Sequence, residues 1–144
     1  MTNIGAPLSG RAANTNWLLQ RFVRETAGVQ HAFAVSSDGL LITFSSNLTR
    51  QAADKMAAVI TGIQSLAEGA STLLECPGLK IVILDLHERY LLVSSISHTA
   101  VLGVVAAHSC DLGQVGYEMA FLSEQIGRVL TPDLITELRN SILE

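Results

Sequence analysis

The chain has 144 residues, of which 49% are hydrophobic and only 15% charged, and its formal net charge is -4 at pH 7. This length fits one domain that buries a sufficient core without disulfide or metal support. The negative balance excludes a broad basic surface for phosphate backbones, so we expect no nucleic-acid binding. Soluble domains usually carry about a quarter of charged residues, and the lower share here favours a protein with a binding partner.

The cysteines and the hydropathy pattern indicate in which cellular compartment the protein is expected. Cys76 and Cys110 are the only cysteines, and their spacing matches no zinc motif, so we expect reduced thiols. Residues 1–9 lack the pattern of a signal peptide, and no stretch reaches the roughly 20 apolar residues of a membrane-spanning helix. We therefore expect a cytoplasmic protein with no direct membrane insertion, which reaches a membrane only through its partners.

The chain is expected to begin with a tail and a helix. Residues 1–14 are rich in Gly, Ser, Asn and Ala and predict a flexible N-terminal tail. A helix is expected from Asn16 to Ala27, with Asn14 or Thr15 as its cap and Gly28 as its stop. Its buried side is expected to contain Trp17, Leu18, Phe22 and Val23.

Two strands joined by a tight turn follow. Val29–Ser36 alternates larger side chains with small ones, which is typical of a strand covered on both faces. Asp38 and Gly39 predict a hairpin turn, because this pair tolerates the positive φ that such turns need. Residues 40–45 alternate apolar and hydroxyl side chains and predict a half-exposed strand at a sheet edge.

The longest predicted helix runs from Leu48 to Leu74, with Asn47 as its cap. Its large apolar residues recur at intervals of three and four, and we expect this stripe to face the protein's own sheet. The stripe contains Met56, Val59, Ile60, Ile63, Leu66, Ala67, Ala70, Leu73 and Leu74. A second stripe contains only small residues, namely Ala58, Gly62, Ser65 and Gly69. Each helical glycine costs about 1 kcal/mol relative to alanine, so the small stripe indicates close approach by another backbone.

Three strands and two helices complete the chain. The strands are expected over residues 79–86, 90–96 and 100–107 as a meander, with the last one central and covered on both faces. Asp111 is expected to cap a long helix, and Pro132 to start a short final one. The apolar side of these helices contains Leu112, Val115, Met119, Leu122, Ile126, Val129, Leu134, Ile135 and Leu138.

This order of elements, with the residues that fill it, resembles the roadblock/dynein light chain family. The stretches that carry the resemblance lie within about residues 15–130 and are Ala34–Ile42, Ala52–Ala70, Leu91–Ile96 and Cys110–Ala120. The likeness is to the bacterial branch encoded beside small Ras-like GTPases, which includes actinobacterial conservon proteins and the gliding-motility regulator MglB. Residues 15–144 are then expected to form a single roadblock-type domain that includes the short C-terminal helix.

The resemblance implies an α/β sandwich built on a five-stranded antiparallel sheet of order 2-1-5-4-3. The long second helix would cover one face, and the first and third helices the other. The resemblance also implies a dimer that pairs the long helices and the third strands, so the third strand would not remain a free edge. The residues assigned to this dimer interface are Ala58, Gly62, Ser65, Gly69, Leu79, Ile81 and Ile83.

No catalytic or metal cluster emerges from the sequence. His108, Cys110 and Asp111 lie where a strand turns into a helix, and no second cluster completes four metal ligands. Asp111 as a helix cap and Cys110 as a small buried residue explain them without metal. His31 is interpreted as a structural histidine of the core or the sheet edge.

Two further patterns are explained by backbone structure. Ser36, Ser37 and Asp38 lack a base between nucleophile and acid, and turn formation already accounts for them. Gly113 and Gly116 open a helix, but their spacing fits neither the dinucleotide fingerprint nor the P-loop. We expect no cofactor and no nucleotide bound by this chain itself.

The leading hypothesis for function comes from the resemblance: a dimeric, non-enzymatic regulator that binds a small Ras-like GTPase. Such a regulator orders the partner's switch loops or supplies an arginine in trans. Arg24, Arg50 and Arg89 are expected to be exposed, and ordinary solvated charge is the simpler interpretation of each. The alternative is a passive scaffold of a membrane-associated sensor kinase complex, without effect on nucleotide turnover. Pairing with a paralogue instead of an identical copy stays open.

Overall fold

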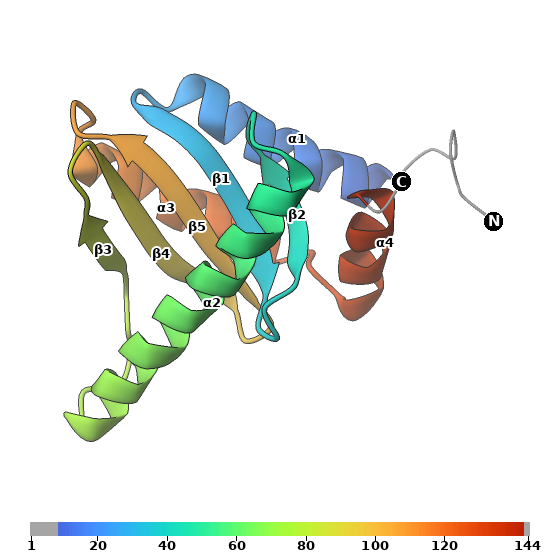
Figure 1. The fold of residues 1–144 in the computed structure, drawn as a ribbon. Helices are drawn as coiled ribbons and strands as arrows, with labels where there is room; N and C mark the ends of the chain where they lie inside the picture. Colours follow the sequence, from blue (N-terminus) through green and yellow to red (C-terminus); the bar gives the residue numbers. More distant parts are fainter. Residues whose placement is uncertain (1–8, 143–144) are drawn as a thin grey trace.

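The computed structural model describes residues 9–142 and contains a five-stranded antiparallel sheet between two layers of helices (Figure 1). The strand order is β2-β1-β5-β4-β3, which confirms the order implied by the resemblance. In chain order the elements are α1 (Gly10–Glu25), β1 (Val29–Ser36), β2 (Leu41–Ser45), α2 (Arg50–Leu73), β3 (Val82–Asp85), β4 (Arg89–Ser97), β5 (Ala100–Ala107), α3 (Leu112–Gly127) and α4 (Pro132–Ile142).

The two faces of the sheet are covered by different helices, as the resemblance implied. Under α2 the strands contribute Phe33, Val35, Leu41, Leu91, Val93 and Val101. Under α1 and α3 they contribute Ala32, Leu92, Leu102, Val104 and Ala106. The short helix α4 packs beside α1 against β2 (Figure 1). The alternation along β1 and the apolar run of β5 therefore mark strands with both faces buried, as predicted.

The structure corrects the expected start of the first helix. We expected it at Asn16, whereas α1 begins at Gly10, so residues 10–14 are helical and do not belong to a tail. Ser9 caps the helix by accepting a hydrogen bond from the backbone N–H of Ala12 at 3.2 Å. Ser9 Oγ also donates to Glu137 Oε1 of α4 at 2.8 Å, a contact that no local pattern announces. The remainder of the predicted tail, residues 1–8, lies outside the described residues.

Three further details differ from the sequence-based expectation. The cap of α2 is Thr49, whose side chain accepts from Ala52 N–H, and not Asn47. Trp17 was expected in the core, but its side chain is 46% exposed and Leu19 is buried in its place. Strand β3 covers only Val82–Asp85, because the register pairs it with β4 no further than Val82 and Val93.

The close approach of α2 to the sheet depends on a glycine of the sheet. A Cβ at Gly103 of β5 would lie 2.3 Å from Ile60 Cδ1, so only glycine leaves room for the Ile60 side chain. Ala53 and Ala57 on the same side of α2 are fully buried and keep the helix close to the strands. The N-terminal half of α2 is thus packed tightly against the sheet.

Within residues 9–142 no helix is both long enough and apolar enough to cross a bilayer.

Candidate protein-interaction surface

Helix α2 is longer than the sheet it covers. Its 24 residues correspond to about 36 Å at a rise of about 1.5 Å per residue. Five strands spaced by about 4.8 Å span only about 19 Å. The last buried residue of α2 is Gln64, and Figure 1 shows the C-terminal part of the helix extending beyond the sheet. The last turns of α2 therefore have no sheet to pack on.

This geometry makes one prediction correct for only part of the helix, because Met56, Ile60 and Ile63 of the large stripe pack on the sheet side and its other large side chains do not. The stripe of large apolar residues was expected to face the sheet, but Leu66 is 79% exposed and Leu73 is 86% exposed. Val59 and Leu74 are exposed as well, and Ile60 is the stripe's only fully buried large side chain. The buried residues of α2 are Ala53, Ala57, Ile60 and Gln64, so small side chains take much of the place beside the sheet that the large stripe was expected to fill.

The small stripe of α2 points away from the sheet. Ala58, Gly62, Ser65 and Gly69 are all exposed. A Cβ added at Gly62 or at Gly69 would meet no atom within 4 Å. The protomer's own packing therefore does not explain these glycines, and their space is open to another molecule. Their assignment to a dimer interface stays a prediction.

Strand β3 forms one edge of the sheet, and its apolar side chains are largely exposed. It pairs with β4 alone, and Ile83 and Leu84 are exposed along it, followed by Leu86. The other two residues assigned to this edge, Leu79 and Ile81, precede the strand and are half-buried. Ile81 packs against the core on the α1 and α3 side. Of the three assigned residues, only Ile83 lies in β3.

We define the α2–β3 surface as the small stripe of α2 together with the exposed apolar side chains of α2 and of the segment 83–86. These side chains are Val59, Leu66, Leu73, Leu74, Ile83, Leu84 and Leu86. The helix and the strand contact each other at this edge of the sheet. Leu84 pairs with Leu91 on the α2 face, whereas Ile83 pairs with Leu92 on the opposite face, so the surface includes both sides of the β3 edge. Exposed apolar regions of this kind are typical of protein-binding sites.

The Ser36 and Asp38 pair, considered as a fragment of a catalytic site, is part of a structural cluster. Ser36 Oγ hydrogen-bonds Asp38 Oδ1, and Arg139 Nη2 of α4 donates to Ser36 Oγ at 3.1 Å and to Asp38 Oδ1 at 3.3 Å. The hydrogen bond from Ser36 and the positive charge of Arg139 lower the pKa of Asp38. The cluster connects α4 to the β1–β2 hairpin, which is a positioning role.

The segment 108–111 is likewise occupied by structural contacts. Asp111 caps α3 through a 3.1 Å bond from the Gln114 N–H, which confirms the predicted cap. Its carboxylate occupies the helix N-terminus that a phosphate would need. Burial and the Asp111 charge raise the pKa of the Cys110 thiol and keep it protonated. His108 Nε2 lies 2.8 Å from Asp85 Oδ1, and residues 9–142 contain no group of three potential metal ligands around it.

His31 has the environment of a structural histidine. The residue is buried, and its Nδ1 lies 2.8 Å from Ser46 Oγ. Burial lowers the pKa of His31, and the charge of Arg89 lowers it further. The neutral ring is thereby favoured, which suits a hydrogen bond between β1 and the segment after β2.

The three arginines considered for a role in trans are exposed. Arg24 lies 3.5 Å from Glu25, and Arg50 lies 3.5 Å from Asp54. For Arg89 no ion pair is found within the described part of the chain. Arg89 is therefore the arginine of the three whose charge is least engaged by the protomer.

Comparisons with known proteins agree with the strand order and helix arrangement. The family model of the Roadblock/LC7 domain matches residues 15–106. A Roadblock/LC7 domain from Streptomyces avermitilis is 29% identical, with a TM-score of 0.74 over 77% of this chain and 92% of that chain. No curated protein matches.

Two structures of the gliding protein MglB share the fold at lower identity. MglB of Thermus thermophilus is 18% identical, with a TM-score of 0.74 over 85% of this chain and 92% of that chain. MglB with a tetrameric arrangement is 17% identical, with a TM-score of 0.75 over 85% of this chain and 91% of that chain.

Proposed function

Since the chain belongs to the Roadblock/LC7 domain family, we propose that it is a dimeric, non-enzymatic regulator of a small Ras-like GTPase in a bacterial signalling complex. The likeness to MglB supports this assignment through the shared fold. The residues support it through what they offer, because the clusters considered for catalysis are engaged in structural contacts, whereas the α2–β3 surface is exposed. The chain thus has the features of a binding module.

The α2–β3 surface is the observation that carries the proposal. Apart from Val59, its apolar side chains lie on the part of α2 that extends beyond the sheet and at the β3 edge. A second copy would cover both at once, since a twofold axis beside β3 pairs β3 with β3 and α2 with α2. The open space at Gly62 and Gly69 lets two helices approach closely. The tetrameric arrangement of one MglB structure supports self-association in this fold.

Regulation of a GTPase requires contact with the loops that surround its nucleotide. A regulator accelerates hydrolysis by ordering these loops or by inserting an arginine, and an inserted arginine increases the rate by roughly a thousandfold or more. Arg89 is the candidate for such an insertion, because it is exposed and unpaired within residues 9–142. Arg24 and Arg50 provide matched controls, because each already has an acidic neighbour.

The experiment combines the purified protein with a small Ras-like GTPase from the same organism. Binding, GTP hydrolysis and nucleotide release are measured with increasing amounts of the dimer. We expect a saturable change in at least one of the two rates. If Arg89→Ala abolishes the change while Arg24→Ala and Arg50→Ala do not, the arginine mechanism is supported. If all three variants retain it, the protein acts through the GTPase loops.

The alternative is a scaffold that binds the GTPase or a sensor kinase complex without changing nucleotide turnover. The same exposed α2–β3 surface would serve this role, because it provides binding area and no reactive group. Saturable binding with both rates unchanged would support the scaffold and contradict regulation.

A further inference from the structure

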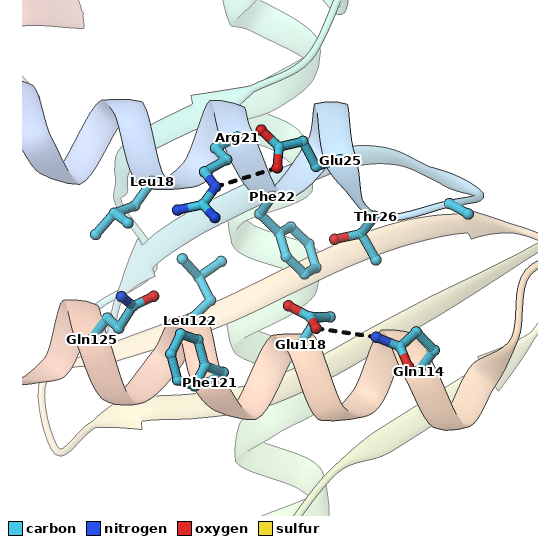
Figure 2. A pocket seen from close by; sticks show the side chains of 11 residues that line it. Leu18, Arg21, Phe22, Glu25, Thr26, Gln114, Glu118, Phe121, Leu122 and Gln125 are labelled. Atoms are coloured by element: carbon cyan, nitrogen blue, oxygen red, sulfur yellow. Dashed lines mark hydrogen bonds and ion pairs between the residues drawn. The ribbon is translucent and has the colours of Figure 1, made fainter.

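Helix α3 has an open space on each of its two sides. The groove toward α1 is lined by polar side chains that already pair with each other, since Arg21 forms an ion pair with Glu25 and Gln114 donates to Glu118 (Figure 2). On the other side of α3, a cavity of about 490 Å³ lies against the edge of the sheet. Its sheet side is formed by the segment before β3 and by the second half of β4, which are not paired with each other.

Strand β4 continues beyond the point at which β3 stops pairing with it. The β3–β4 pairing ends with Val82 opposite Val93, whereas β4 remains paired with β5 as far as Ser97. The last residues of β4 therefore have a neighbouring strand on one side only. Figure 1 shows the chain before β3 leading away from this part of β4. The sheet is thus open beside the second half of β4.

The hydrogen-bond pattern shows in which direction the backbone of Ser95 points. Across the β3–β4 turn the Leu86 N–H donates to the Arg89 carbonyl at 2.9 Å, so the backbone groups of Arg89 point toward β3. This direction recurs at every second residue of an antiparallel strand, which gives Ser95 the same orientation. Continuing the register of β3 places Lys80 opposite Ser95. Within residues 9–142 no backbone hydrogen bond of Lys80 is found, so this potential pair is open.

Residues 79–81 have the side-chain pattern of a strand that continues β3. Ile81 already packs against the core on the α1 and α3 side, and the alternation of a strand would point Leu79 to that same face. Lys80 between them would point to the other face. Gly78 before the segment has a φ of 96°, and glycine also adopts ordinary conformations, so the chain can reorient there without strain. The segment can therefore lie along β4 with its apolar side chains toward α3.

We propose that residues 79–81 close onto β4 when the α2–β3 surface binds a second copy, so that β3 becomes longer at its N-terminal end. In the closed form Lys80 and Ser95 make the next hydrogen-bonded pair of the β3–β4 ladder, and the sheet extends along the cavity beside α3. This inference rests on the proposed dimer, because the second copy is what favours the closed form.

The coupling between closure and dimer formation follows from the backbone groups at the sheet edge. In β3 the groups of Val82 and Leu84 point toward β4, and those of Ile83 and Asp85 point outward. Closure adds Ile81 to this outward row, so a strand of the second copy finds more hydrogen-bond partners. In the protomer alone, closure gains one hydrogen-bonded pair and costs the backbone freedom of three residues, so neither form is strongly favoured. Binding of a second copy then shifts the population to the closed form.

A disulfide between positions 80 and 95 tests the proposal in the full chain. Lys80→Cys and Ser95→Cys are combined with Cys76→Ser, which removes the exposed natural cysteine. Residues opposite each other in a hydrogen-bonded antiparallel pair have Cα atoms about 5.5 Å apart, a distance that a disulfide can span. We expect the bond to form within one chain. The oxidised protein should then have a dimer dissociation constant roughly tenfold lower than the same protein after reduction, because closure precedes binding. Sedimentation equilibrium measures both values.

Two controls separate closure from general mobility of the segment. Lys80→Cys with Ser97→Cys, in the same Cys76→Ser background, places the second thiol out of register and should oxidise much more slowly. Hydrogen exchange of the wild type provides a measurement without substitutions. The Lys80 N–H of the closed form points toward β4 and not toward the second copy, so its protection reports closure itself. This protection should increase as the dimer fraction increases.

Three results would overturn the proposal. The first is a failure of positions 80 and 95 to form a disulfide within one chain. The second is an oxidised protein whose dimer dissociation constant is unchanged or higher. The third is an out-of-register pair that oxidises as readily. A wild-type dimer in which the Lys80 amide stays unprotected would also contradict closure, but not the proposed dimer. A wild-type protein that is monomeric at every concentration would contradict both.

Discussion

The two halves of α2 differ although they form one continuous helix. In the N-terminal half Ala53, Ala57 and Ile60 are fully buried against the sheet, whereas in the C-terminal half Leu66 and Leu73 are exposed. The first half therefore contributes to the stability of the protomer. The second half offers apolar surface that only another molecule can bury. The two halves differ in role because α2 is longer than the sheet beneath it and continues beyond the sheet's edge (Figure 1), and not because their residue types differ.

Ile60→Ala should have the largest effect on the protomer. The side chain is fully buried over β5, so its removal costs the transfer free energy and leaves a cavity. We expect the free energy of unfolding to fall by about 2–5 kcal/mol, measured by urea denaturation. A loss no larger than that of an exposed leucine variant would contradict the account of the N-terminal half.

Gly103→Ala tests the packing of Ile60 by changing the residue of the sheet that lies beneath it. The new Cβ would meet Ile60 at 2.3 Å, so the helix or the side chain has to shift. We expect a loss of about 1–3 kcal/mol in the free energy of unfolding, as in other overpacked cores. Adding Ile60→Val removes the nearest methyl group and should recover part of this loss, giving a positive coupling in a double-mutant cycle. Strictly additive effects would show that the two residues do not meet.

Leu66→Ala and Leu73→Ala should affect the protomer least. Both side chains are exposed, so unfolding at a dilution where the protein is monomeric should change by no more than about 0.5 kcal/mol. The dimer dissociation constant should nevertheless increase by roughly tenfold, since truncating an apolar interface residue costs about 1 kcal/mol or more. Isothermal dilution calorimetry measures this dissociation constant. If either variant strongly changed protomer stability and left association unchanged, the C-terminal half of α2 would stabilise the protomer and not the dimer, which would contradict the comparison.

Local patterns predicted most of the fold, because the signals lie within a few residues of one another. The cap at Asp111, the proline start of α4 and the doubly buried strand β1 follow from such signals and are confirmed. The expected start of α1 was wrong because it depends on a contact distant in sequence, since Ser9 caps the helix and is held by Glu137. The burial of Ile60 was expected, but the room that Gly103 leaves for it was not.

The candidate site was predictable only in part. The small stripe at Gly62 is exposed as expected, but the large stripe is divided between core and solvent because the sheet ends beneath the helix. Periodicity identifies the side of a helix and not the extent of the surface that it covers. The exposure of Trp17 could not be predicted for a different reason: Leu18 and Phe22 fit a buried side that includes either Trp17 or Leu19, and periodicity does not choose between them.

The central claim, that the C-terminal half of α2 and β3 form a dimer interface, is tested most directly by Gly62→Leu. A Cβ at Gly62 meets no atom within 4 Å and the position is exposed, so the variant should fold. Gly116→Leu on α3 is the matched control, because a Cβ there also meets no atom within 4 Å. Light scattering of dilute protein should give the dimer mass for the wild type and for Gly116→Leu, and the monomer mass for Gly62→Leu. A Gly62→Leu protein that remains as dimeric as the wild type would contradict the assignment of this surface.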